Sequence, residues 1–487
     1  MSQVILFAPI SDPLRVTFTL PPWAMLHVAA PLAEHGYSVC IIDQNTDLHW
    51  EKRLKQELGM ETILVGVTAM TGSQLTYVIE FVKKVRSIAK VPVVWGGGHA
   101  SVFPEQTIRS EHADIVVAGE GEETILELAW KLKEGSTIKD VQGIWHKENG
   151  QVRKNPERQF IEMDMLPKIP YDLINPEKYI FKTSYASRNF ELCTSRGCTH
   201  GCKFCYNLCV NRQKWRAKSA ERVVAELKNL VQNFDIDGLN WRDDNFFTDK
   251  KRVEEICRLM IQEGLLVKWH ADARVDYFDS YDDDFINLMK KAGLRRLTLG
   301  VESGSQRILD QMKKDITTEQ VLRVNEKLKK HRIQCMYHFS FGYPKETMDD
   351  ARQTVILIDK LLKNNPEAGV WPPSMYTPYP GTPMFEEAVK SGFTLPEKLE
   401  DFSKFAWESS NLPWLKEEYA KKLEAAVYII TGYASRMPLS KKWFGPRFRK
   451  LLEKSDPGSI MEKPFVDFML QSIRSSKLVS SLVPQMG

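Results

Sequence analysis

The chain of 487 residues lacks long apolar runs, and this absence argues against a membrane-spanning protein. A membrane span needs about 18 uninterrupted apolar residues. The longest candidates here, such as residues 425–431, are short enough to be parts of core helices. The first twenty residues have no basic n-region, and the apolar run 4–10 is interrupted by the sequence Ser11-Asp12-Pro13. Because an export signal needs a basic n-region followed by an apolar core, we predict a cytoplasmic protein.

A large charge of one sign is also missing. The chain has 67 basic and 63 acidic residues, a formal net charge of +4 that is too small for a general nucleic-acid binder. Apolar residues make up 43% and charged residues 27%, which excludes a disordered chain and predicts sizeable cores. At about 150 residues per domain, the length predicts about three domains.

Cysteines are few, and most of them are crowded into one segment. Cys40, Cys257 and Cys335 are scattered within apolar segments, where we expect buried small side chains. The other five of the eight fall between Cys193 and Cys209. In a cytosolic chain such crowding indicates metal binding rather than disulfides.

Residues 1–135 alternate short apolar segments with helical patterns. We predict strands at 4–8, 39–43, 63–68, 91–95 and 114–118, with helices between them, for instance at 25–35, 73–89 and 122–133. Alternation of this kind predicts an α/β fold with an open parallel, Rossmann-like sheet that carries helices on both faces. Such sheets bind ligands at the carboxyl ends of their strands.

Glycine and small polar residues follow the third, fourth and fifth predicted strands. The candidate ligand-binding residues in these three loops are Thr68, Met70 and Ser73, then Gly97, Gly98 and His99, and then Gly119, Glu120 and Gly121. Glycines there let a large ligand approach the backbone, although tight turns alone would also explain them. His99 taken by itself is better interpreted as a loop hydrogen-bonding residue than as a metal ligand. No G-x-G-x-x-G follows the first strand, so we do not expect a dinucleotide site.

Residues 136–185 have the composition of a connector. A hairpin is predicted at 144–153 with its turn at Asn149-Gly150, and prolines are frequent after it. We predict an N-terminal domain at 1–140, a hairpin and linker at 141–185, a second domain at 186–388, and a helical C-terminal domain at 389–487.

The cysteine-rich segment contains a compact ligand pattern. Cys198, Cys202 and Cys205 form C-x3-C-x2-C, and Phe204 precedes the last cysteine. Thiolates are the preferred ligands of iron–sulfur clusters, and three ligands on a four-iron cluster leave one iron open to a substrate. A cluster closed by Cys193 or Cys209 remains an alternative, and so does a structural zinc site.

The pattern C-x3-C-x-aromatic-C resembles the signature of radical S-adenosylmethionine (SAM) enzymes. Strands predicted at 238–241, 266–270, 296–301, 334–341 and 369–376 alternate with helices, and with the strand leading into Cys193 they make six βα units. Six such units resemble the partial (β/α)6 barrel of that superfamily, whose active sites lie at the carboxyl ends of the strands.

The resemblance implies a 4Fe–4S cluster and SAM as cofactors, and it gives roles to residues at the strand ends. SAM chelates the open iron through its amino and carboxylate groups. The residues implied are Asp243 or Asp244 for the ammonium group, Arg274 for the carboxylate, Glu302 beside Ser303 for the ribose hydroxyls, and Gly342 for the adenine. For any one of these side chains an ordinary salt bridge is the alternative.

An open sheet ahead of such a barrel resembles the cobalamin-dependent branch of radical SAM enzymes, across most of residues 1–385. That branch includes C-methyltransferases and the anaerobic cyclase of bacteriochlorophyll synthesis, and it implies cobalamin at the three glycine-containing loops. The cobalt-ligating pattern D-x-H-x-x-G is missing, because its nearest match at 47–52 lacks the glycine. The resemblance then implies that the lower face of cobalt meets residues 68–73.

The activity implied is cleavage of SAM to a 5′-deoxyadenosyl radical, followed by transfer of a methyl group from methylcobalamin to an unactivated carbon. The substrate is expected to be a small molecule or a lipid- or tetrapyrrole-like one, and the electron donor a flavodoxin or ferredoxin. The alternatives are ring closure or oxidation without methylation, an RNA methylthiotransferase-like activity, and a non-catalytic cobalamin or iron–sulfur carrier. The methylthiotransferase alternative needs a second cysteine set, and Cys40 is alone in the first domain.

The last hundred residues are predicted to be helical, most clearly at 415–435 and 464–476. From residue 436 onward the chain has ten basic and four acidic residues, and basic residues are interspersed with aromatic ones at 441–450. A solvated face with aromatic anchors in the core explains this segment, while substrate binding or peripheral membrane contact is the alternative. We expect no nucleic-acid partner.

Overall fold

The computed structural model describes residues 2–10, 19–404 and 412–434. These residues form two compact units. Unit 1 contains the described residues up to 179 together with 394–404, and unit 2 contains 180–393 together with 412–434. The chain therefore leaves unit 1, builds most of unit 2, returns to unit 1 at 394–404 and enters unit 2 again at 412–434. The basic–aromatic segment 441–450 and the predicted helix 464–476 lie outside the described residues.

Unit 1 is built on one seven-stranded sheet with the order β2-β1-β3-β4-β5-β6-β7. Its first five strands are parallel, as predicted. Their bounds are β1 (Val4–Ala8), β2 (Val39–Asp43), β3 (Leu64–Thr68), β4 (Val93–Gly96) and β5 (Ile115–Val117). In a sheet of this order the carboxyl ends of the strands form the ligand-binding edge.

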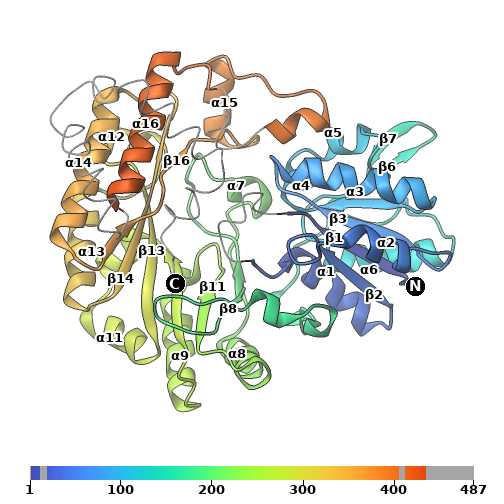
Figure 1. Cartoon of the computed structure of the whole chain (residues 1–487), viewed down its shortest axis with the longest axis horizontal. Helices are drawn as coiled ribbons and strands as arrows, with labels where there is room; N and C mark the ends of the chain where they lie inside the picture. Colours follow the sequence, from blue (N-terminus) through green and yellow to red (C-terminus); the bar gives the residue numbers. More distant parts are fainter. Residues whose placement is uncertain (1, 11–18, 405–411, 435–487) are drawn as a thin grey trace. The chain divides into compact units, whose positions relative to one another are not determined.

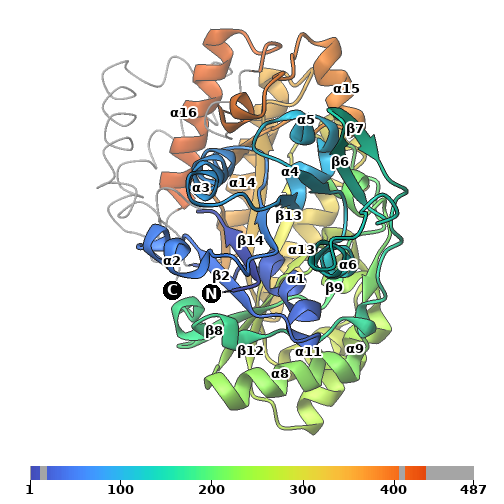
Figure 2. The ribbon, with the colours of Figure 1, turned by 90° about the vertical axis from the view of Figure 1, so that its right-hand side faces the viewer.

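The helices of unit 1 lie on both faces of the sheet. Their bounds are α1 (Trp23–Glu34), α2 (Trp50–Glu57), α3 (Gln74–Ile88), α4 (Gly97–Val102), α5 (Pro104–Arg109) and α6 (Glu122–Lys133), with short 3-10 turns at Met163–Met165, Tyr171–Leu173, Pro176–Tyr179 and Leu399–Lys404. Ile5 and Phe7 of β1 pack with α2 and α3, whereas Val4 and Leu6 pack with α1 and α6. Figure 2 shows these two helix pairs on opposite sides of the strands.

The predicted hairpin is present and extends this sheet. β6 (Ile144–Glu148) pairs antiparallel with β5 and with β7 (Gln151–Lys154). Asn149 and Gly150 form the turn with φ of 49° and 78°, the left-handed backbone that a two-residue hairpin needs. The returning segment also packs on unit 1, because Leu399 and Phe402 are buried in the same core as α3.

Unit 2 contains a parallel sheet with the order β8-β11-β12-β13-β14-β15, the partial barrel that the sequence predicts. Its strands are β8 (Asn189–Leu192), β11 (Gly238–Trp241), β12 (Lys268–Ala273), β13 (Leu294–Glu302), β14 (Gln334–Phe341) and β15 (Ala368–Val370). A small antiparallel pair, β9 (Ser195–Arg196) and β10 (Arg216–Ala217), stands beside this sheet.

The sixth predicted strand, 369–376, is wrong as a single element. The structure divides it into β15 and β16 (Ser374–Met375), and both pair with β14. Pro372 and Pro373 lie at the break. Proline has no amide hydrogen for the ladder, so a continuous strand cannot pass through this pair.

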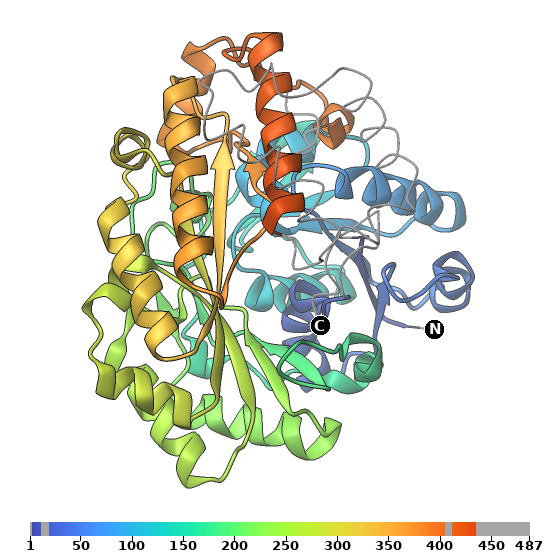
Figure 3. The same cartoon turned by 60° about the vertical axis from the view of Figure 1, so that its left-hand side comes forward.

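Helices cover the outside of the unit 2 sheet (Figure 1). They are α8 (Ala220–Phe234), α9 (Lys250–Gln262), α10 (Val275–Ser280), α11 (Asp283–Lys291), α12 (Gln306–Gln311), α13 (Thr318–Lys330) and α14 (Met348–Asn364), with α7 (Asn207–Val210), α15 (Pro383–Lys390), α16 (Glu417–Ala434) and a 3-10 turn at Phe246–Thr248 completing the unit. Figure 3 shows α16, in orange-red, in the region of α14, which it contacts. Within the described residues no helix is both long and apolar enough to cross a membrane.

The strands of unit 2 present different side chains to their two faces. Trp241, Trp269, Leu297 and Tyr337 are fully buried on the outer face, where the Tyr337 hydroxyl donates to Asn325 of α13. Because side chains alternate along a strand, their neighbours point to the inner face. That inner face is polar. It carries Asn240 on β11 and Arg242 directly after it, then His270 and Asp272 on β12, then Arg296, Thr298 and Gly300 on β13, and then Gln334, Met336, His338 and Ser340 on β14.

Gly304 allows the loop after β13 to lie against α14. A Cβ on Gly304 would lie 2.5 Å from the Thr354 Cα and 2.6 Å from the Gln353 carbonyl oxygen. We predict that Gly304→Ala lowers the stability of the protein by about 1–3 kcal/mol, the usual cost of overpacking a rigid contact. Thermal unfolding followed by circular dichroism checks this. Gly369→Ala, whose Cβ would meet only the flexible end of Met336, is the matched control and should lower Tm less.

Candidate active site

The three pattern cysteines lie in one loop between β9 and α7 of unit 2. Cys202 is 7% exposed, and the Cys205 amide donates to the Cys202 carbonyl at 3.0 Å. The loop begins at Gly197, whose φ is +89° and whose Cβ would lie 1.9 Å from the Lys214 carbonyl oxygen. A side chain at this position would displace the loop, so glycine is required where the cysteine segment starts.

Nitrogen donors point at two of the three thiols. The Asn245 side-chain amide donates to the Cys198 sulfur at 3.3 Å, and the Arg274 guanidinium donates to the Cys202 sulfur at 3.5 Å. Burial opposes the charge of Lys314, but Glu302 and, to a smaller extent, Cys202 raise its pKa. Positive charge and N–H donors around thiolates are what an anionic iron–sulfur cluster needs. The donor set therefore fits such a cluster.

No three Cys, His, Asp or Glu side chains of the described residues converge closely enough to hold a single metal ion. The thiolates of a four-iron cluster ligate different irons, so they do not have to meet at one point. The thiols of the two flanking cysteines donate hydrogen bonds to backbone carbonyls. Cys193 donates to the Ser195 carbonyl at 3.4 Å and Cys209 to the Pro380 carbonyl at 3.3 Å. Burial raises the pKa of Cys193 to about 12.

The two aspartates after β11 have different surroundings. Asp243 is 2% exposed and accepts hydrogen bonds from the Thr194 amide, the Thr194 hydroxyl and the Ser195 hydroxyl at 2.6, 2.6 and 2.7 Å. It therefore joins the end of β11 to the end of β8. Asp244 accepts from the Gly197 amide at 2.7 Å and remains accessible to water. Surrounding protein atoms and the charge of Asp243 raise the pKa of Asp244.

A charged group lies at the end of β13. Glu302 has φ of +73° and follows an irregularity in the β13–β14 register. Its carboxylate pairs with Lys314 at 2.9 Å and with the His338 ring at 3.2 Å. Burial opposes the charge of Glu302, but Lys314 and His338 lower its pKa. A Cβ on Gly300 would lie 2.8 Å from the Glu302 carboxylate and 3.1 Å from the Lys314 ammonium, so the glycine leaves room for the ion pair.

Other predicted SAM contacts are already engaged with the protein. Ser303 is fully buried, and its hydroxyl lies 3.3 Å from the Thr354 hydroxyl. The Gly342 amide donates to Glu346 at 2.5 Å, and its carbonyl accepts from the Trp414 indole at 3.0 Å. Phe204 lies under the Lys314 ammonium, 5.6 Å from the ring centroid. Sequence reasoning missed Lys314, because it follows a helix rather than a strand and belongs to no motif.

Hydrogen bonds connect the three predicted ligand loops of unit 1. The Thr71 hydroxyl lies 3.0 Å from the His99 ring, and the Gly119 amide donates to the Ser101 hydroxyl at 3.0 Å. His99 is fully buried against Phe103 and Phe402, and burial lowers its pKa to about 4. His99 therefore holds the loops together instead of pointing to solvent.

Two glycines allow the loops after β3 and β4 to approach closely. A Cβ on Gly97, whose φ is +86°, would lie 2.2 Å from the Thr68 hydroxyl, and one on Gly98 would lie 2.6 Å from the Met70 sulfur. Met70 is 41% exposed at this edge. Ser73 precedes α3, while Gly121 precedes α6 and Glu120 accepts from the Ile161 amide at 2.9 Å. A glycine-rich edge that leaves an apolar side chain exposed fits a large flat ligand such as cobalamin.

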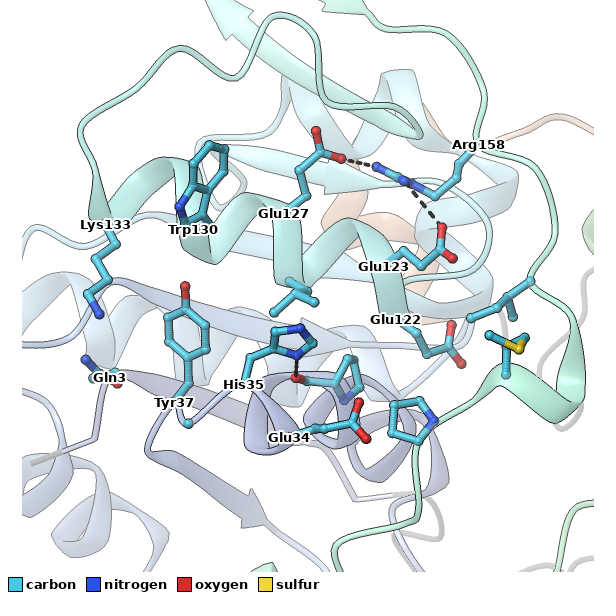
Figure 4. A pocket seen from close by; sticks show the side chains of 16 residues that line it. Gln3, Glu34, His35, Tyr37, Glu122, Glu123, Glu127, Trp130, Lys133 and Arg158 are labelled. Atoms are coloured by element: carbon cyan, nitrogen blue, oxygen red, sulfur yellow. Dashed lines mark hydrogen bonds and ion pairs between the residues drawn. The ribbon is translucent and has the colours of Figure 1, made fainter.

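A cavity of about 680 Å³ lies elsewhere on unit 1. Figure 4 shows it between the end of α1, the helix α6 and the segment that contains Arg158, which hydrogen-bonds Glu123 and Glu127. Its wall includes Gln3 and Tyr37, which precede β1 and β2. These two residues lie at the amino ends of the strands, and the wall continues along α6 to Glu122 and Ile161, beside the loop 119–121.

The fold and the three-thiol loop define a radical SAM protein, and comparison with known proteins agrees. The radical SAM superfamily model matches residues 192–358, and the B12 binding domain model matches residues 14–129. An uncharacterised methyltransferase of Pyrococcus horikoshii is 33% identical over 381 residues, covering 77% of this chain and 80% of that protein. The anaerobic magnesium-protoporphyrin IX monomethyl ester cyclase of Rubrivivax gelatinosus is 28% identical over 429 residues, covering 85% and 73%.

A solved structure has the same fold. The radical SAM methyltransferase TsrM of Kitasatospora setae, solved with cobalamin and a 4Fe–4S cluster, matches with a TM-score of 0.68 at 17% identity, covering 93% of this chain and 99% of that one. The chain belongs to the cobalamin-dependent radical SAM enzymes, whose cofactors are a 4Fe–4S cluster, SAM and cobalamin.

Gly97 provides a test of the unit 1 edge. We predict that Gly97→Ala weakens cobalamin binding at least about tenfold, because the new Cβ would push apart the loops after β3 and β4 and strain the positive φ. Titration with hydroxocobalamin followed by absorbance measures this. Iron content should equal that of wild type, since the cysteine loop belongs to unit 2. Unchanged cobalamin affinity would show that this edge does not bind the cofactor.

Asn245 provides a test of the cysteine loop. Removing its N–H···S bond with Asn245→Leu should destabilise the reduced cluster, so the reduced-to-oxidised ratio at a fixed potential should fall about fivefold. An electron paramagnetic resonance titration of the reconstituted protein measures this ratio. Tyr277→Phe, which removes a hydroxyl that contacts Asn245 and His200 but no thiol, is the control. A potential that moves equally in both variants would contradict the assignment.

Proposed function

We propose that this enzyme transfers a methyl group to an unactivated carbon of a small-molecule substrate, using SAM and cobalamin. The observation that carries the proposal is the three-thiol loop at the carboxyl end of a barrel with a polar inner face, in one chain with a glycine-edged cobalamin-type sheet. The Pyrococcus relative named a methyltransferase supports the same reaction class.

The cofactors supply the difficult chemistry: the reduced cluster cleaves SAM, and cobalamin carries the methyl group. In the proposal, Cys198, Cys202 and Cys205 hold the cluster. Asp244 is the better choice for the SAM ammonium group, because its carboxylate remains accessible whereas Asp243 already accepts three hydrogen bonds.

Arg274 and Glu302 complete the proposed SAM contacts. Arg274 contributes positive charge for the SAM carboxylate from its place beside Cys202. Glu302 is held by Lys314 and would accept hydrogen bonds from the ribose hydroxyls. A low-potential flavodoxin or ferredoxin is the proposed electron donor.

Ring closure without methyl transfer is the second candidate. The similarity to magnesium-protoporphyrin monomethyl ester cyclases favours it, because the Rubrivivax protein matches over 85% of this chain. A methylthiotransferase-like activity is less favoured. Cys40 is the one cysteine among residues 1–179, and burial raises its pKa to about 11.

The proposal is tested by measuring two products of SAM together. Anaerobically reconstituted, reduced protein should form both 5′-deoxyadenosine and S-adenosylhomocysteine, the second only when cobalamin is added. Mass spectrometry measures both. Formation of 5′-deoxyadenosine without S-adenosylhomocysteine would contradict methyl transfer and favour cyclisation. Neither product, with cluster and reductant intact, would leave a non-catalytic carrier as the explanation.

A cysteine variant separates catalysis from folding. Cys202→Ala should abolish formation of 5′-deoxyadenosine, because the cluster loses one of three ligands, while cobalamin binding should persist in unit 1. Cys257→Ala is the matched control, since Cys257 is buried on α9 and lies outside the loop. Product formation by Cys202→Ala at the wild-type rate would contradict the assignment of this thiol.

A further inference from the structure

The inner face of β11 to β14 carries more charge than the SAM contacts require. Arg242 directly follows β11, Asp272 lies on β12 and His338 lies on β14, and their side chains are 44%, 49% and 38% exposed. Surrounding protein nevertheless raises the pKa of Asp272. Side chains that are enclosed by protein yet reached by water line the inside of an open barrel.

Two ion pairs of this face are neutral. Arg242 lies 3.5 Å from the fully buried Glu191, and Lys314 lies 2.9 Å from Glu302. Asp272, His338 and Arg296 carry the other charges of the face.

The nearest ion-pair neighbour of Asp272 is a histidine rather than a lysine or arginine. The closest cation-forming group within ion-pair distance is the His270 ring at 3.8 Å, and burial lowers the pKa of His270 to about 3, so that ring is neutral. Burial raises the pKa of Asp272 although Arg242 and His338 act to lower it, and neither of these two cations forms a direct ion pair with it. The Asp272 carboxylate is therefore open to a direct contact with an ammonium group.

His338 has the opposite character. Its Nδ1 side lies 3.2 Å from Glu302, and although burial opposes the charge, Glu302 raises its pKa. Because Lys314 already balances Glu302, a protonated His338 adds one positive charge. The register places Thr298 beside Asp272 and Gly300 beside His338 on the intervening strand β13.

On the amino-terminal side of these groups, the inner face carries Arg296 and several uncharged polar side chains. Arg296 donates to Gln334 at 3.2 Å and to Ser184 at 2.7 Å, and it stacks over the Tyr185 ring at 5.2 Å. The Tyr185 hydroxyl donates to Asn240 at 2.7 Å. Among the inner-face positions of β11 to β14, Met336 is the one with a large apolar side chain. A lipid or tetrapyrrole would leave this polar lining without partners.

We propose that the inner face of β11 to β14 is the substrate subsite, and that it takes a small zwitterion of the amino-acid class, with its ammonium group at Asp272 and its anionic group at His338. The inference rests on the proposed function for the reaction and names the substrate class. Arg242 is paired with Glu191 at 3.5 Å, so it is not assigned to the substrate.

A matched set of probes tests the class without turnover. L-phenylalanine carries both charges, 2-phenylethylamine only the ammonium group, and 3-phenylpropionate only the carboxylate. Isothermal titration calorimetry on the full-length protein with cluster, cobalamin and S-adenosylhomocysteine bound measures their affinities. Phenylalanine should bind at least about fivefold tighter than either single-charge probe, since each charge-assisted contact contributes.

Two nearly isosteric variants assign the charges. Asp272→Asn should weaken phenylalanine and phenylethylamine about fivefold and leave phenylpropionate unchanged, whereas His338→Gln should weaken phenylalanine and phenylpropionate and leave phenylethylamine unchanged. Asp279→Asn removes a carboxylate that pairs with Arg323 on the outside, and it should change none of the affinities. Circular dichroism and iron content of each variant report folding.

The outcomes separate this inference from the proposed function. Equal affinities for the three probes, no binding, or affinities that do not respond to Asp272→Asn and His338→Gln would overturn the zwitterion subsite. Tighter binding of protoporphyrin than of phenylalanine would overturn it as well. None of these measurements depends on SAM cleavage, so a failure of the two-product assay in wild type is a separate result that concerns the reaction alone.

Discussion

Charge pairing inside the barrel is the constraint on which the rest of unit 2 depends. A carboxylate without a partner in a protein interior costs several kcal/mol, so Glu191 and Glu302 persist only because Arg242 and Lys314 lie beside them. The Glu302–Lys314 pair in turn needs Gly300 beneath it and a left-handed backbone at Glu302. One ion pair thus fixes the end of β13, the position of His338 and the ammonium group that lies over Phe204.

The two cofactor edges are built by different means. In unit 1, hydrogen bonds connect the loops to one another. The Thr71 hydroxyl bonds to the His99 ring, and the Gly119 amide donates to the Ser101 hydroxyl. In unit 2 the cysteine loop is fixed to distant strands by Asp243, Asp244, Asn245 and Arg274, each of which bonds to the segment 194–202. Both arrangements place a glycine where two segments approach closely, Gly97 in unit 1 and Gly197 in unit 2.

Local signals were enough for most of the fold and for the cysteine loop. Continuous apolar runs placed β1 and β2 to the residue, and the spacing of Cys198, Cys202 and Cys205 identified the class of cofactor. Partners distant in sequence were not predictable. The choice between Asp243 and Asp244 depends on Thr194 and Ser195, 48 or 49 residues away, and the Gly342 carbonyl is taken by Trp414, 72 residues away. The broken sixth strand was predictable in principle from Pro372-Pro373, but the apolar pattern on both sides concealed it.

The return of the chain to unit 1 has a consequence for folding during synthesis. Leu399 and Phe402 complete the core beside α3, yet residues 180–393 of unit 2, 214 residues, are synthesised first. At about 5–20 residues per second this interval lasts roughly 10–40 s. During that time the nascent first unit exposes the apolar surface that the returning segment will cover. A protein truncated before residue 399 would keep that surface exposed permanently.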